Sequence, residues 1–294
     1  MPICRYIALV LCALSAAGCV GGRNWNPFGE VAAPALSPHA TCEQVVAHLN
    51  SNIERCTGWR STNVSIKSDQ VMLGATGMIA VESPRRFRML VKAFIADLAD
   101  LGSNDERLWF WMRPMADQPS YVMTCSHEDL PVAQQRMPVP FRPDWLMEVL
   151  GVIPIDPSTV ELEPNPGDAG EFLLVSHQTA PDGTPVRRVM TVDATRGVIV
   201  NHTLWNVSAD GAQLIAQARL SDHRRDERTG VTLPHKIELT YVDANATLTL
   251  AIKSIEVNPT GVAATTWTPG IAGTYPCRDM ATGQLVSIEQ DRAY

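Results

Sequence analysis

The chain contains 294 residues, of which 45% are hydrophobic and 19% are charged, and it carries a formal net charge of -7 at pH 7. This composition indicates a folded globular protein, and the length allows one large β domain or two smaller domains. The net negative charge argues against nucleic acid as a partner, because neutralising phosphates requires a basic surface.

The N-terminus has the pattern of a secretory signal that ends at a cysteine. Arg5 precedes an apolar core over residues 7–14, and small residues lead from there to Cys19. The apolar core is too short to span a membrane. The run before Cys19 resembles the bacterial lipobox, and this resemblance implies cleavage before Cys19 and acylation of its thiol. We therefore predict a lipoprotein signal peptide over residues 1–18 and a palmitate-type lipid anchor at Cys19.

Residues 19–40 contain repeated Gly, Pro, Asn and Ala without an apolar period, as expected of a flexible tether behind the lipidated N-terminus. No later apolar segment approaches the roughly twenty residues that a transmembrane helix needs. Val20 follows the predicted cleavage site, and by analogy with the lipoprotein sorting rule of enterobacteria it favours the outer membrane. We expect a cell-envelope protein that is held at the outer membrane by its lipid and faces the periplasm.

Four cysteines remain after the predicted signal and the lipid site, and an oxidising periplasm would allow this even number to form disulfides. They are Cys42, Cys56, Cys125 and Cys277. Pairing of Cys42 with Cys56 is disfavoured if both lie on one straight helix, because they would then be about 21 Å apart. The sequence does not choose among the other pairings.

The first predicted element is a helix. Thr41 and Gln44 form a capping box, and the apolar residues Val45, Leu49 and Ile53 follow at helical spacing. This pattern predicts a helix from Cys42 to about Thr57.

The chain then alternates in hydrophobicity, which predicts β-strands from residue 59 to residue 95 and again over residues 108–112. Residues 84–88 enter one strand, and the cluster over residues 100–105 predicts a turn before the next. The second strand is apolar on both faces, so we expect an enclosed interior on one side and a helix or loop on the other.

These two strands resemble the core of the LolA/LolB-like family of periplasmic lipoprotein carriers and outer-membrane lipoprotein receptors. The residues that carry the resemblance are a Pro-x-x-Phe-Arg strand and a polar turn that leads into Leu-Trp-Phe-Trp: Pro84, Phe87, Arg88, Ser103, Asn104, Asp105, Leu108, Trp109, Phe110 and Trp111. The resemblance implies an amphipathic helix followed by antiparallel strands curled into an open barrel, with helices over its mouth. It also implies that Arg88 holds the lid through hydrogen bonds to loop carbonyls; the other interpretation of Arg88 is an exposed strand charge.

The second half of the chain continues this pattern. A short amphipathic helix begins near Pro143, contains Trp145 and Leu146, and ends at Gly151, which makes it a candidate lid. Alternating segments separated by turn-forming residues then predict a meander of hairpins. We predict a mainly β (α+β) fold, a half-open antiparallel β-barrel over residues 41–258 with an N-terminal helix and a short lid helix. Residues 259–294 form a C-terminal extension that wraps the surface or hangs loose.

A hydrophobic cavity inside such a barrel would bind acyl chains, and flexible methionine side chains suit ligands of variable shape. The predicted lining is Met72, Met78, Phe87, Met89, Val91, Trp109, Trp111, Met112, Trp145, Leu146 and Leu150. The same residues could instead fill a solid core.

Sequence motifs for catalysis are missing: the chain has no Gly-x-Ser-x-Gly, His-Glu-x-x-His, Cys-x-x-Cys or phosphate-binding glycine loop. Residues 125–129 group reactive side chains, but a strand end followed by a charged turn explains them better. Residues 222–228 are explained as a solvated hairpin. His177 and His202 could meet across strands as metal ligands, although nothing in their spacing requires it. We predict no cofactor and no metal.

The preferred hypothesis is a non-enzymatic lipoprotein that binds the acyl chains of lipidated protein N-termini or other lipids and delivers them to the outer membrane, with a soluble periplasmic carrier as a further partner. The alternative is a structural or scaffold envelope lipoprotein with a solid barrel and a protein-binding surface. A hydrolase with an unrecognised site is a third hypothesis, and it requires a polar cleft with a carboxylate or histidine of shifted pKa.

Overall fold

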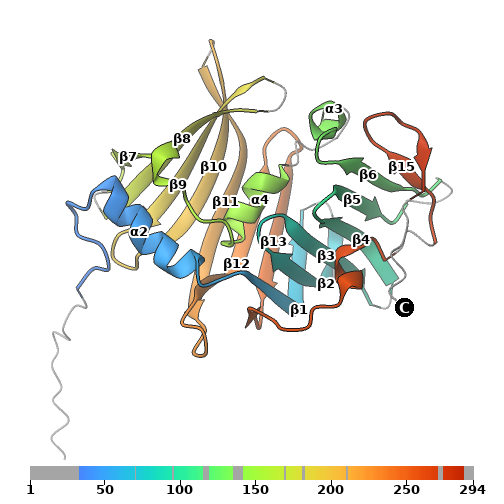
Figure 1. Ribbon diagram of the computed structural model, residues 1–294, viewed down its shortest axis with the longest axis horizontal. Coiled ribbons are helices and arrows are strands. Elements are labelled where there is room, and N and C mark those ends of the chain that lie inside the picture. Colours follow the sequence, from blue (N-terminus) through green and yellow to red (C-terminus); the bar gives the residue numbers. More distant parts are fainter. Residues whose placement is uncertain are drawn as a thin grey trace, which may run out of the picture. The chain divides into compact units, whose positions relative to one another are not determined.

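The described residues form one sheet of sixteen strands in the computed structural model, in the order β16-β15-β6-β5-β4-β3-β2-β1-β13-β12-β11-β10-β9-β8-β7, with β14 paired to β1 (Figure 1). The strands are β1 (Gly58–Ser68), β2 (Val71–Glu82), β3 (Arg86–Ala93), β4 (Ala96–Ser103), β5 (Arg107–Met112), β6 (Val122–Ser126), β7 (Glu161–Pro164), β8 (Glu171–Thr179), β9 (Pro185–Asp193), β10 (Val198–Ser208), β11 (Gly211–Arg225), β12 (Thr232–Tyr241), β13 (Ala246–Ile252), β14 (Glu256–Val257), β15 (Cys277–Asp279) and β16 (Leu285–Val286).

The structure describes residues 33–287 except residues 70, 95, 115–118, 135–141, 169, 181–182, 210 and 271–273, and it does not describe the side chains of residues 71–73. The predicted signal peptide, the lipid site Cys19, the tether as far as residue 32 and the side chain of Met72 therefore lie outside the described part. Residues Pro34–Tyr294 belong to one compact unit.

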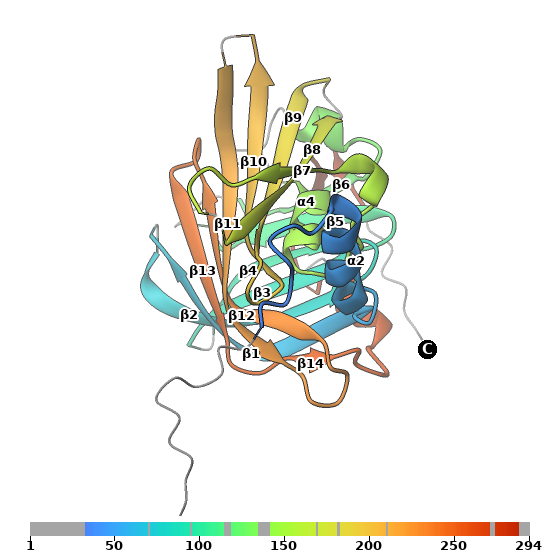
Figure 2. The same cartoon turned by 90° about the vertical axis from the view of Figure 1, so that its left-hand side faces the viewer.

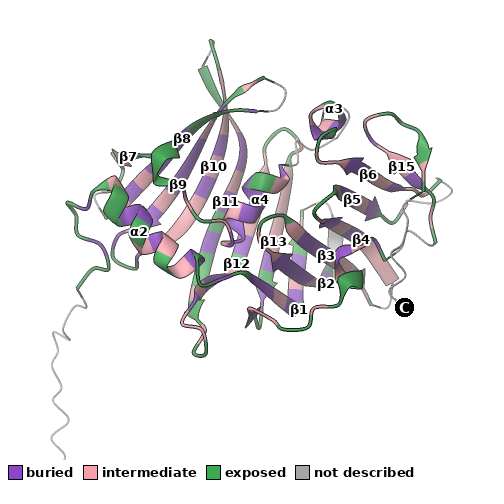
Figure 3. Ribbon diagram, viewed as in Figure 1, coloured by how far each residue is buried: buried purple, intermediate pink, exposed green. Residues whose placement is uncertain are grey.

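The predicted half-open antiparallel barrel is confirmed. Two runs of hairpins, β1–β6 and β7–β13, are joined because β1 pairs with β13, for instance Ile66 with Leu250. Within the described chain, β7 and β16 end the sheet without pairing to each other, so the sheet stays open. Buried and exposed residues alternate along the strands, as the two-residue period of a strand dictates (Figure 3).

Two helices cover the same face of the curved sheet, which we call the inner face (Figure 2). The first is α2 (Cys42–Ile53), whose capping box of Thr41 and Gln44 is present as predicted. Val45, Val46 and Leu49 of α2 pack against strand residues that include Leu174 and Met190. The helix ends at Ile53 and not near Thr57, so Cys56 lies outside it and precedes the first strand.

The second helix is α4 (Pro143–Val149), the predicted short helix, with proline at its start and Gly151 in the left-handed conformation (φ 74°) just after its end. A further short helix, α3 (Leu130–Gln134), follows β6. No helix among the described residues is long and apolar enough to cross a membrane.

The turn predicted over residues 100–105 was placed too early, because β4 continues to Ser103 and only Asn104, Asp105 and Glu106 turn. Asp100 lies within this strand and is only 1% exposed. Its carboxylate accepts hydrogen bonds from Arg88 on β3 and from the indole of Trp109 on β5. These partners stabilise an acidic residue inside a strand, where its residue type alone predicts a turn.

The C-terminal extension is part of the same sheet as far as the structure describes it. The 3-10 helix η2 (Ala264–Trp267) lies against β3, and β15 runs parallel to β6 with Cys277 opposite Val122. The described residues of the extension therefore pack on the sheet and continue it through β15 and β16. The four cysteines of the described chain are thiols and form no disulfides with one another.

Candidate functional site

The centre of the inner face is an apolar cluster into which α4 inserts. Phe87 and Met89 of β3 belong to it together with Trp145, Leu146 and Leu150 from α4 and its C-cap, and Val91 packs against it. The strand register explains why the β3 residues share this face: Met89 lies opposite Ile79 on β2 and Leu101 on β4, and paired residues point to the same side.

The same register divides the predicted cavity lining between two faces. Met112 is aligned with Val91 through Ala99 and so lies at the inner face, where it is 65% exposed. Met78 is opposite Leu90, on the outer face. Trp109 and Trp111 are opposite Gly102 and Asp100, also on the outer face. The two tryptophans and Met78 therefore cannot line one cavity with Met89.

The polar contacts that hold α4 come from β9 and from β1. Arg188 on β9 is buried, and its guanidinium binds the carboxylate of Asp144 and that of Glu148, the latter at 2.5 Å. The indole Nε1 of Trp59 on β1 donates to the carbonyl of Leu150 at 2.9 Å. The helix thus has one ionic contact cluster on β9 and one hydrogen bond on β1.

Burial dominates the electrostatics beneath α4. It raises the pKa of the Glu148 carboxyl to about 6, against the opposing effect of the nearby Arg188 cation. Burial also lowers the pKa of His202 on β10 to about 3, and Arg188 adds to this shift. At neutral pH His202 is therefore an uncharged imidazole beside a guanidinium.

Three buried nitrogens of this region have no hydrogen-bond partner among the described atoms: Trp145 Nε1, Arg188 Nε and His202 Nε2. Leaving a buried donor or acceptor unsatisfied costs about 1–3 kcal/mol, so such atoms are uncommon in a purely structural core. Their concentration around α4 sets the inner face apart from an ordinary apolar interior.

Arg88 does not contact the lid helix, and the prediction of that contact is wrong for the described residues. Its side chain points to the outer face, where it pairs with Asp100 at 2.9 Å and donates to the carbonyls of Thr265 and Thr266. Those carbonyls belong to the C-terminal extension. A Cβ built on Gly270 would lie 2.6 Å from Arg88 Nη2, so any larger residue there would require the guanidinium to shift.

The extension also covers the tryptophans of β5. Trp109 and Trp111 cluster with Val122 and Cys277, and the ring of Trp111 packs on Tyr275 with centroids 5.2 Å apart. The expectation that a second layer covers this strand is confirmed, and the layer is the C-terminal extension.

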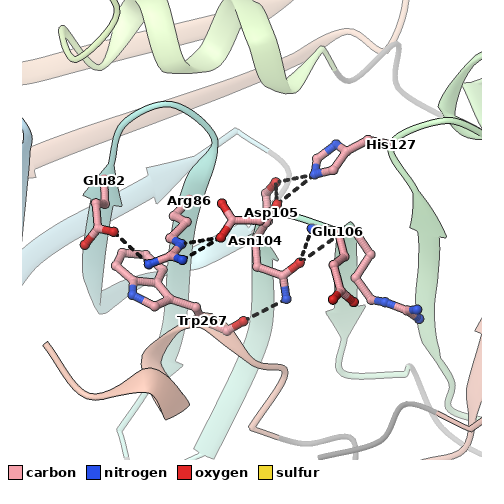
Figure 4. Close-up of polar contacts among 9 residues, drawn as sticks. Glu82, Arg86, Asn104, Asp105, Glu106, His127 and Trp267 are labelled. Carbon is pink, nitrogen blue, oxygen red and sulfur yellow. Dashed lines mark hydrogen bonds and ion pairs between the residues drawn. The ribbon is translucent and has the colours of Figure 1, made fainter. Parts of the chain in front are cut away.

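The polar turn between β4 and β5 has a structural role, because its hydrogen bonds connect it to the C-terminal extension and to His127 after β6 (Figure 4). Asn104 accepts from the backbone of Glu106 and Arg107 and donates to the carbonyl of Trp267 at 3.1 Å. His127 lies 2.8 Å from the carbonyl of Asn104 and 3.4 Å from the hydroxyl of Ser103 through the same nitrogen, Nε2. Because a carbonyl can only accept, this nitrogen carries the proton and cannot act as a base toward Ser103.

A separate pocket of about 220 Å³ opens between α2, the end of α4 and strands β10–β12. Its lining includes Glu148 and His202, the groups with shifted pKa that the hydrolase hypothesis required. In the described chain, however, neither is hydrogen-bonded to a serine, threonine or cysteine: Glu148 binds Arg188, and the Ser51 hydroxyl in the pocket donates to a backbone carbonyl. The arrangement lacks a nucleophile paired with a base.

His177 and His202 do not meet across the sheet. Ser176 is buried on the inner face, so His177, the next residue on β8, points to the outer face, whereas His202 is buried on the inner side. No group of three His, Cys, Asp or Glu side chains in the described part of the chain could hold a metal ion.

Sequence reasoning missed Arg188 as the residue that contacts the lid. The sequence contained a signal for this contact. Val186, Arg188, Met190 and Val192 are alternate residues of one strand and so point to the same face, and the three residues other than Arg188 are apolar and buried. An arginine on that face must be buried, and a buried arginine needs acidic partners.

No protein-family model matches the sequence, and no curated protein sequence matches it significantly. Solved structures with a similar fold include a domain from Vibrio parahaemolyticus named for outer-membrane lipoprotein sorting (TM-score 0.48, 10% identity, 78% of this chain and 97% of that one). A LolA superfamily protein from Nitrosomonas europaea has a TM-score of 0.46 and 12% identity and covers 78% of this chain and 98% of its own. A DUF1329 family protein from Desulfovibrio piger has a TM-score of 0.48 and 11% identity, over 77% and 95%. At these identities and TM-scores the likeness assigns neither a family nor an activity to this chain.

Proposed function

We propose that this protein is a membrane-anchored lipoprotein that faces the periplasm, binds the acyl chains of lipoproteins or other lipids on the inner face of its sheet, and delivers them to the outer membrane. The observation that carries the proposal is the contact between α4 and that face. The helix buries Trp145, Leu146, Met147 and Val149 there, and Arg188 and Trp59 of the sheet make polar contacts with the helix and its C-cap.

An acyl chain can replace α4 on this surface without exposing the surface to water. Each methylene that leaves water contributes about 0.8 kcal/mol, so a long chain competes well with the side chains of a two-turn helix. Met89 lies in the cluster that α4 covers, and its flexible thioether adapts to chains of different shape. Met112 at the rim of the same face is largely exposed and could contact an entering chain.

The predicted anchor at Cys19 supports a receptor and not a diffusible carrier, because a soluble carrier has no lipid of its own. One acyl chain gives only marginal membrane binding, so stable attachment requires more than one. The N-terminal pattern and the resemblance of the β3–β5 residues to the LolA/LolB-like family both support this placement.

A scaffold lipoprotein remains the second candidate, and a specific observation favours it. Trp145 and Leu150 are almost fully buried, at 1% and 2% exposure, so α4 fills the inner face well in this conformation. A permanently seated α4 would make the barrel solid and leave only its surface for binding.

Native mass spectrometry with an N-palmitoylated peptide separates the two candidates. The protein without its signal peptide should bind one peptide, and Met89→Phe should reduce that binding at least tenfold because the larger ring occupies the inner face. Leu90→Phe is the matched control: Leu90 is the next residue on β3 and points to the outer face, so it should bind like the wild type.

Circular dichroism spectra and melting temperatures of the two variants show whether both remain folded. A folded wild-type protein that takes up no acylated peptide would rule out the acyl-binding proposal and favour the scaffold. An equal loss of peptide binding in both variants would show that the ligand does not bind at the inner face.

A further inference from the structure

We propose that the pocket between α2, α4 and strands β10–β12 is a second ligand site, and that it binds a phosphate monoester, either as a free small molecule or as the headgroup of a lipid. The inference goes beyond acyl binding, because it concerns a polar pocket beside the end of α4 and not the apolar cluster that α4 covers. It rests on the cationic groups that line the pocket and on a buried histidine that also lines it.

Three arginines line the pocket without a carboxylate partner among the described residues: Arg55 after α2, Arg196 in the β9–β10 turn and Arg225 at the end of β11. A Cβ built on Gly230 would lie 3.1 Å from Arg225 Nη2 and 3.4 Å from Arg55 Nη1. The two guanidinium groups therefore approach the same point. Like charges converge in this way at a cost, which a bound anion would remove.

Histidines extend this polar surface into the pocket. His223 Nε2 donates to the carbonyl of Ile199 at 3.0 Å, which leaves its Nδ1 as an acceptor 3.4 Å from Arg196 Nη2. His48 bonds the carbonyl of Gly197 at 3.1 Å. His202 lines the pocket at 2% exposure, and its Nε2 has no partner among the described atoms. A hydroxyl or oxyanion oxygen of a ligand would satisfy that atom.

Glu148 is the one acid among the described lining residues, and it pairs with Arg188, against the three arginines that line the same pocket. The pocket therefore favours anions. Phosphate suits several guanidinium groups better than a carboxylate does, because it offers more oxygens and up to two negative charges. The remaining wall, which includes Leu49, Ile53 and Leu220, accommodates the carbon skeleton of an ester.

Titration calorimetry of the full folded domain with sn-glycerol 3-phosphate tests the proposal, and dihexanoyl phosphatidic acid serves as the lipid form of the same group. Arg225→Gln and Arg55→Gln should each weaken binding about tenfold, the expected loss for one charge-assisted contact. Arg224→Gln is the matched control, because Arg224 is adjacent in sequence, does not line the pocket and pairs with Asp222 at 2.6 Å.

Binding of glycerol 3-phosphate with this variant pattern supports a free ligand, and binding of the phosphatidic acid alone with the same pattern supports a lipid headgroup. Failure of both probes, or equal weakening by Arg224→Gln, would overturn the site. Glycerol 3-phosphate has no acyl chain, and Met89→Phe should leave its binding unchanged. The phosphate site and the acyl site can therefore fail independently.

Discussion

The two faces of the sheet are each closed by a segment that packs over a buried arginine, but the arginines are paired differently. On the outer face Arg88 pairs with Asp100 of the neighbouring strand, and the covering extension offers only the carbonyls of Thr265 and Thr266. The charge of Arg88 therefore stays balanced by the sheet itself, whatever the extension does.

On the inner face both acidic partners of Arg188 belong to the covering helix α4. Asp144 and Glu148 would leave with the helix, and Arg188 would then need another anion or water. A buried cation that loses its partners is costly, so displacement of α4 is coupled to a supply of new polar contacts. Under the proposed function the outer cover is a permanent part of the fold, and the inner cover is the one that a ligand must displace at the cost of the Arg188 ion pairs.

The largest effect is expected from Arg88→Met. It leaves the carboxylate of Asp100 buried without its cation, which should cost about 3–5 kcal/mol of unfolding free energy in urea titrations. Arg86→Met on the same strand is the control, because the Arg86 pairs with Glu82 and Asp105 are half-exposed and should be worth about 1 kcal/mol or less. Similar losses in both variants would remove the distinction between the buried pair and the exposed ones.

Arg188→Gln should have a smaller global effect, about 2 kcal/mol, and a local one. Its partners are partly exposed, with 58% of the Asp144 side chain and 27% of the Glu148 side chain accessible, so water can replace the arginine. Hydrogen exchange should accelerate in residues 143–149 and stay unchanged in β15, and uptake of the palmitoylated peptide should rise.

An unchanged exchange rate in α4 together with slower uptake would contradict the exchangeable cover. Faster hydrogen exchange in β15 as well would mean that α4 and the C-terminal extension open together, and the claim that only α4 is exchangeable would then be wrong.

Much of this fold could be predicted from the sequence because its local signals agree. The capping box at Thr41 marked α2, and Pro143 with Gly151 bounded α4. The alternation of β8–β13 and the turn residues between the strands predicted the hairpins. These signals are local, and each is set by the backbone geometry of a few residues.

The site was harder to predict, because it depends on which face each strand presents. Trp109 and Met89 both alternate within apolar strands, but the turns between the strands set the register and place them on opposite faces. The residue type of Asp100 predicts a turn, and only the three-dimensional structure shows that Arg88 and Trp109 donate hydrogen bonds to its carboxylate within the sheet. Arg88 and Arg188 look alike in sequence, and only the residues across the sheet decide which one meets α4.

The pH dependence of the unfolding free energy tests whether the inner face is covered by α4, because the buried His202 lies beneath that helix. His202 has a folded pKa of about 3, well below the 6.5 of an ordinary histidine, because it is buried beside Arg188. The unfolded chain thus binds a proton that the folded chain does not, so His202 lowers the unfolding free energy as pH falls from 6.5 toward 3. One pKa unit corresponds to 1.36 kcal/mol, so the loss between pH 6.5 and 5 should be about 2 kcal/mol.

His202→Phe should flatten this part of the urea-unfolding profile, whereas His177→Gln, at an exposed histidine of the outer face, should keep the wild-type slope. Glu148 acts in the opposite direction: its folded pKa of about 6 is raised above the ordinary 4.5, so its contribution to stability is lost as pH rises from 4.5 through 6. Glu148→Gln should therefore steepen the acid loss that His202 causes. If His202→Phe left the slope unchanged, His202 would already be solvated under α4, and the inner cover would be open in the free protein.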